Sequence, residues 1–171
     1  MQPTMIVLRL FHIFSGVLWV GGVALLGWFL VPSIQATGPA GGGVMKHLLV
    51  NTKFGPYFPA LGGLTVLSGL LMYWRDAAGS NGAFYSSHMG ITLGIGGLAG
   101  LIAVIYGGGV VGRSASGMAK LFRAIDAQGG PPTAEQTARL MALRDKVSAG
   151  SKIVLPMLLT AVIAMAVARY V

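Results

Sequence analysis

The chain has 171 residues, of which 54% are hydrophobic and only 9% are charged, with a formal net charge of +8. A soluble domain carries about a quarter charged residues, so this composition excludes an ordinary soluble fold and indicates a protein that spans a bilayer. The chain contains no cysteine, which excludes disulfides, iron–sulfur clusters, thiolate zinc sites and c-type haem. The basic residues flank apolar segments, so they favour lipid headgroups over nucleic acid as partners.

A membrane-spanning helix needs about 20 predominantly apolar residues. Four segments approach or exceed that length, namely residues 5–31, 56–74, 88–111 and 151–168. Pro32 is expected to end the first of them. The Gly/Pro-rich residues 37–43 then argue against a regular helix, and residues 44–53 are expected to form a short interfacial helix.

The longest polar stretch, residues 113–150, separates the third and fourth segments. Apolar residues recur with helical spacing over residues 114–127, which predicts an amphipathic helix. Residues 129–132 read as a turn, and Thr133 with Gln136 matches a capping box at the start of a second helix. We expect an antiparallel helical hairpin that could continue the third and fourth segments. The alternative is that both helices lie on the membrane surface.

The sequence therefore predicts an all-α protein, an integral membrane four-helix bundle with a cytoplasmic amphipathic hairpin, in one domain of residues 1–171. Four spans put both termini on the same side of the membrane, and that side has three basic residues, Arg9, Arg75 and Arg169. The other side has nine, namely Lys46, Lys53, Arg113, Lys120, Arg123, Arg139, Arg144, Lys146 and Lys152. The side richer in Lys and Arg is cytoplasmic, so both termini are expected to face outward.

Two histidines, His12 and His88, lie at the edges of apolar segments in the outer leaflet predicted by this topology. Two imidazoles on different helices could hold one haem iron. Arg9, one turn outward of His12, could meet a haem propionate, and Gly16 would leave room for a flat group. Alternatively, His12 only bonds a neighbouring helix and His88 only caps its own.

Copper is the second chemical possibility, because thioethers and imidazoles suit Cu(I). His12 would act with methionines near the outer ends of the segments, namely Met5, Met72, Met89 and Met165. Methionine is also common filler in apolar cores, so this pattern has a purely structural reading as well.

Glycine pairs four residues apart, such as Gly90 with Gly94 and Gly96 with Gly100, favour close helix packing within the bundle or between identical subunits. The four acidic residues lie outside the apolar segments, and no paired carboxylates or Ser-His-Asp set is evident. The sequence does not decide whether the protein is an enzyme.

Residues 10–22, LFHIFSGVLWVGG, resemble the first span of a broad bacterial superfamily. It includes copper-resistance protein D-like membrane domains, the membrane part of a urate-oxidising protein, and membrane protoporphyrinogen oxidase. Residues 64–74 and 164–170 resemble small integral membrane proteins of the same group. The resemblance implies a four-helix bundle in the bacterial cytoplasmic (inner) membrane, with b-type haem or copper at His12. The acidic and basic set of protoporphyrinogen oxidase is not evident in the spans, so that activity is not expected.

Three functions follow as hypotheses. The first is a haem b protein that transfers electrons near the outer membrane face, to or from quinone or a redox partner protein. The second is a copper-handling membrane protein. The third is a non-catalytic membrane subunit or scaffold.

Overall fold

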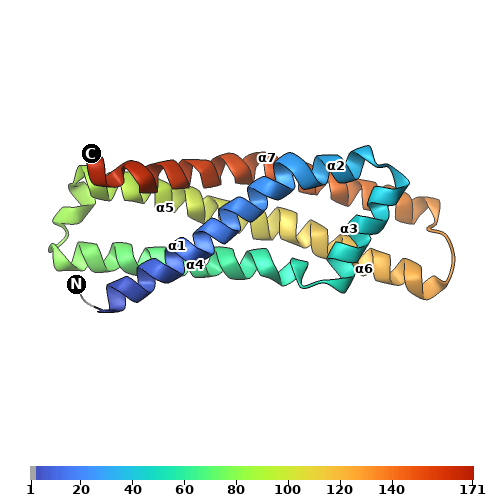
Figure 1. The fold of residues 1–171 in the computed structure, drawn as a ribbon, viewed down its shortest axis with the longest axis horizontal. Coiled ribbons are helices and arrows are strands. Elements are labelled where there is room, and N and C mark those ends of the chain that lie inside the picture. Colours follow the sequence, from blue (N-terminus) through green and yellow to red (C-terminus); the bar gives the residue numbers. More distant parts are fainter. Residues whose placement is uncertain (1–2) are drawn as a thin grey trace.

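The structure, a computed structural model, describes residues 3–171, and the regular elements in that range are all helical. The all-α prediction is thus confirmed. Four helical stretches are long and apolar enough to cross a membrane, namely Pro3–Ala36, Phe54–Gly79, His88–Gln128 and Ala134–Tyr170. They indicate a multi-pass membrane protein. They lie along one another in an elongated helical bundle, with the two ends of the described range, Pro3 and Val171, at the same end of the molecule (Figure 1).

The first half of the chain forms two of these stretches. Helix α1 (Pro3–Leu25) continues through a π-helical turn, η1 (Leu26–Leu30), into α2 (Val31–Ala36). Helix α3 (Pro39–Asn51) then crosses the end of the bundle, and α4 (Phe54–Gly79) returns along α1 (Figure 1).

The second half forms one long hairpin. After the 3₁₀ turn η2 (Ala83–Ser86), α5 (His88–Tyr106) continues through a second π-helical turn, η3 (Gly107–Gly112), into α6 (Arg113–Gln128). Helix α7 (Ala134–Val167) runs back beside α6 and α5, and it ends in η4 (Ala168–Tyr170) (Figure 1).

The connection between α1 and α4 is more helical than expected. Pro32 does not end the helix, because the chain stays helical from the π-helical turn η1 through Pro32 to Ala36. Residues 39–43 are helical as well. Gly38 turns the chain with a φ of 58°. At Gly41 a Cβ would lie 1.9 Å from the carbonyl oxygen of Ile34, so glycine is what lets α3 fold back on α2.

The capping box predicted at Thr133 and Gln136 is confirmed, since each side chain bonds the backbone N–H of the other residue. Gly129, in the left-handed region, ends α6. Helix α3 packs on this hairpin around a second apolar cluster, whose buried members are Leu49, Met118 and Ala119. An ion pair between Lys46 and Asp126 joins α3 to α6, but both side chains are exposed, so it adds little stability.

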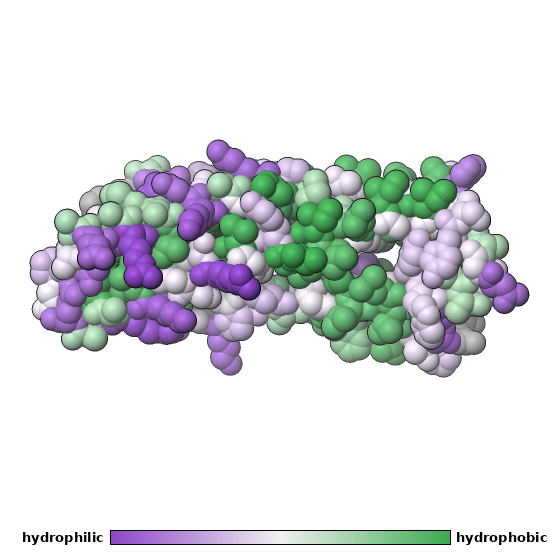
Figure 2. All heavy atoms as spheres, turned by 180° about the vertical axis from the view of Figure 1, so that it is seen from behind, coloured by the Kyte–Doolittle hydropathy of each residue, from purple (hydrophilic) through white to green (hydrophobic). Residues whose placement is uncertain are grey.

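The main apolar cluster lies between the long helices and has Trp19, Ala103, Val154 and Leu158 as its buried members. Most other large apolar side chains on these helices are exposed. Figure 2 shows them as an apolar region next to a hydrophilic end formed by the α6–α7 hairpin. Such a surface is suited to lipid, in which exposed apolar side chains carry no penalty.

Small residues allow α5 and α6 to approach α7 along most of its length. A Cβ at Gly96 would lie 3.0 Å from Ala164 Cβ, and one at Gly150 would lie 2.6 Å from Val111 Cγ2. Farther along, a Cβ at Gly117 would lie 3.3 Å from Leu143 Cδ1. We call this contact line the α5–α7 seam. By contrast, a Cβ at Gly97, one residue from Gly96, would meet nothing within 4 Å.

We therefore expect Gly96→Leu to destabilise the protein, because the side chain would push α5 away from α7, with a cost of about 1–3 kcal/mol for overpacking. Gly97→Leu is the matched control, with the same change in helix propensity but no neighbour to displace. Thermal unfolding of both variants in detergent would measure the difference. Equal melting temperatures would show that the seam tolerates separation.

Candidate functional site

His12 lies on α1, half-buried against α4 and inside the apolar part of both helices. Its Nδ1 is 2.8 Å from the backbone carbonyl oxygen of Thr65. A carbonyl oxygen only accepts hydrogen bonds, so Nδ1 must carry the proton and donate it. In the neutral ring the lone pair is therefore on Nε2.

Three hydroxyl side chains surround this hydrogen bond. Ser15 and Ser68 are almost fully buried. Thr65 Oγ1 donates to Ser15 Oγ at 2.8 Å, which joins α1 to α4, and Ser68 Oγ lies 3.5 Å from His12 Nδ1. The Ser15 and Ser68 hydroxyls donate to carbonyls four residues earlier on their own helices, whereas the single proton of Thr65 Oγ1 is shared between Ser15 Oγ and the Leu61 carbonyl, each at 2.8 Å. The contact between α1 and α4 thus has a polar centre within an apolar region, which we call the His12 cluster.

Gly69 makes room for the imidazole. A Cβ at this position would lie 2.8 Å from His12 Cε1 and 3.1 Å from Nδ1. The sequence places Gly69 on one helical stripe with Gly62, Thr65 and Met72, which favours close helix packing, but it does not single out Ser68. The signal for Ser68 was its spacing, because it lies three residues after Thr65 on a helix that was expected to pack in the membrane.

Gly16 and Arg9 lie on the same stripe of α1 as His12. Gly16 faces Thr65 of α4, because a Cβ there would lie 3.5 Å from Thr65 Cγ2, an ordinary packing distance. Arg9 is exposed, one helical turn toward the N-terminal end of α1. Its position is compatible with either an anionic group or a lipid phosphate.

His88 lies elsewhere. It is the first residue of α5 and is exposed, and the cap of that helix is the Ser87 hydroxyl, which accepts from the Gly90 N–H. Helix α1 packs mainly on α4, whereas α5 packs mainly on α7. Within residues 3–171, no group of three or more His, Cys, Asp or Glu side chains comes together as metal ligands. His88 thus lies at the exposed start of α5, and His12 lies on the α1–α4 pair.

The four methionines lie on four different helices. Met5 and Met72 are half-buried on α1 and α4, and Met89 is exposed on α5. Met165 belongs to the α5–α7 seam, because its Cε would lie 3.3 Å from a Cβ at Gly96. This contact accounts for Met165 as packing between helices.

An apolar hollow of about 410 Å³ lies on the outside of α1 and is lined by Val7, Leu10, Phe11 and Phe14. By helical spacing, this face of α1 is opposite to the one that carries His12. The hollow is thus directed toward lipid and does not adjoin the His12 cluster.

No family model matches the chain, and comparison with curated proteins and with solved structures likewise gives no match.

Gly69→Ala is expected to weaken the packing of α1 on α4, because the new Cβ would displace the His12 ring from the Thr65 carbonyl. The cost should be about 1–3 kcal/mol, as for other overpacked sites. Gly63→Ala is the control, since a Cβ there would meet nothing within 4 Å. Thermal unfolding of both variants would give the difference.

The same substitution should cost much less in a His12→Ala background, where no ring is displaced. Such coupling between the two sites is what a double-mutant cycle measures. An equal cost with and without His12 would mean that Gly69 serves another contact.

Proposed function

We propose that the protein binds haem b through His12 and transfers electrons within the membrane. The observation that carries this proposal is the hydrogen bond from His12 Nδ1 to the Thr65 carbonyl. Histidines that bind metals through Nε2 almost always donate the other ring N–H to a carbonyl or carboxylate, which fixes the tautomer and the ring orientation. A bound haem would supply one-electron redox chemistry.

The residues around His12 fit one axial ligand. Thr65 and Ser68 orient the ring, and Gly69 leaves the space that the ring occupies. Arg9 is the cation available to a propionate at the outer end of α1. His88, exposed at the start of α5, enters the proposal only as a candidate second ligand.

Absorption spectroscopy of the purified protein, after expression with sufficient haem, tests the proposal. The wild type should show a Soret band, and His12→Ala should abolish it or greatly weaken it, because no neighbouring alkyl group replaces an axial ligand. His47→Ala is the control, since His47 is exposed on α3 at the opposite end of the bundle. Absence of a Soret band from the wild type would reject haem.

Copper handling is the alternative, and metal analysis of the same sample separates it from haem. Copper at stoichiometric level, lost in His12→Ala and without a Soret band, would favour copper. Neither cofactor, together with a co-purifying protein, would favour the role of a membrane subunit, in which the His12 cluster serves only to hold α1 on α4.

The proposal includes a location: a four-helix bundle in the bacterial inner membrane, with the α6–α7 hairpin in the cytoplasm and the His12 cluster nearer the outer face. Nine of the twelve Lys and Arg residues belong to the hairpin side and three to the side of the termini. This asymmetry supports the proposed orientation, because basic residues are enriched on the cytoplasmic side of membrane proteins. Electrons would then pass to or from quinone or a redox partner protein near the outer face.

Reporter fusions test this orientation. A reporter that is active only in the periplasm should be active when fused after Val171 and inactive when inserted at Gly130, in the turn between α6 and α7. The reverse pattern would place the hairpin outside and overturn the orientation.

A further inference from the structure

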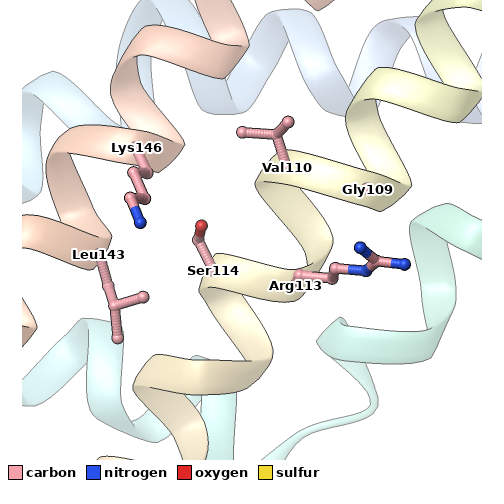
Figure 3. Close-up of a pocket in the computed structure, with 6 residues that line it drawn as sticks. All are labelled: Gly109, Val110, Arg113, Ser114, Leu143 and Lys146. Carbon is pink, nitrogen blue, oxygen red and sulfur yellow. The ribbon is translucent and has the colours of Figure 1, made fainter.

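A second site is suggested by a pocket at the other end of the bundle, where α5 passes into α6. The pocket has a volume of about 470 Å³ and lies between this junction and α7 (Figure 3). It is lined by Gly109, Val110, Arg113, Ser114, Leu143 and Lys146. The junction is the π-helical turn η3, and insertions of this kind in α-helices are frequent at functional sites.

The Ser114 hydroxyl is the unusual group in this pocket. Only 7% of Ser114 is exposed. The other two buried serines, Ser15 and Ser68, both donate to the carbonyl four residues earlier. Within the described residues, Ser114 Oγ has no hydrogen-bond partner, and it points into the pocket (Figure 3). Among the described residues no buried side-chain oxygen lacks a partner, so the Ser114 oxygen is not sealed off but is open to the pocket, where it is free to donate to a ligand.

The charge of the pocket defines that ligand. The Lys146 ammonium is directed into the same space as Ser114 Oγ, from the opposite wall (Figure 3). The Arg113 guanidinium points away along the other side of its helix, where it adds positive potential (Figure 3). Of the lining residues none is acidic, and Asp145, the nearest acid in the sequence, is exposed. A hydroxyl donor and an ammonium without a carboxylate suit a phosphate group.

The position of the pocket favours a lipid as the source of that phosphate. The apolar third segment ends at η3, and the apolar part of α7 begins after Lys152. The pocket thus lies where the apolar region meets the basic hairpin, at the depth of lipid headgroups. Val110 and Leu143 add an apolar wall that a free anion would not need. We propose that this pocket binds the phosphate of an anionic phospholipid in the leaflet at the hairpin end.

Titration of the purified full chain in neutral detergent tests the proposal, with the melting temperature as the readout. The probes are short-chain phosphatidylglycerol, phosphatidylcholine of the same chain length, and inorganic phosphate. Phosphatidylglycerol should raise the melting temperature saturably and more than the other two. Lys146→Gln should weaken its apparent affinity about fivefold, the factor expected for one basic residue near a membrane surface. Ser114→Ala should weaken it about tenfold or more, as expected for one lost hydrogen bond to a charged group.

Lys120→Gln is the matched control, because it removes the same charge from an exposed site on α6. Lys120 lies about 9 Å along the helix axis from Ser114, by the rise of six residues. At that distance screening should limit the loss of affinity to less than about twofold. Equal losses in Lys120→Gln and Lys146→Gln would mean diffuse attraction and overturn the site. The proposal would also fail if both pocket variants bound like the wild type, or if inorganic phosphate or phosphatidylcholine reproduced the full effect.

Discussion

The close approach of α5 and α6 to α7 is the constraint on which the rest of the structure depends. In lipid there is little hydrophobic force between helices, so association relies on packing of small residues. Here Gly96, Gly117 and Gly150 lie at close approaches along the α5–α7 seam, which runs from the apolar region into the polar hairpin. Because the same two helices continue beyond the apolar region, the hairpin takes its position directly from the packing inside it. Helix α3 then packs on the hairpin.

Helix α1 is held differently. It contacts mainly α4, and much of its remaining surface is exposed. The contact combines close packing, as where the Trp19 ring lies against Gly62, with the hydrogen bonds of the His12 cluster. Hydrogen bonds between membrane helices are individually modest, commonly about 1 kcal/mol. The attachment of α1 therefore depends on a few polar groups, the same groups that would orient an iron ligand.

Much of the helical organisation was predictable, because it is encoded locally. Apolar segment length indicated the four long helices, and the Thr133–Gln136 capping box marked the start of α7. The helix through residues 39–43 was not predictable, because glycine is unfavourable in helices unless a close neighbour requires it, and at Gly41 that neighbour is the Ile34 carbonyl. The neighbours of His12 were likewise not predictable, because they come from another helix. Sequence indicated His12, but only the fold shows that Thr65, Ser68 and Gly69 surround it.

The π-helical turns have a mechanical consequence. Gly27 in η1 and Gly107 in η3 both lie beside the same turn of α7, against Leu155 and Val154, and Pro156 follows there. Three of the four long helices therefore depart from regular i→i−4 hydrogen bonding at about one level. Helices bend most readily at π turns and prolines. This level is thus a natural hinge plane between the part with the His12 cluster and the basic hairpin, and strain from either side would concentrate in it.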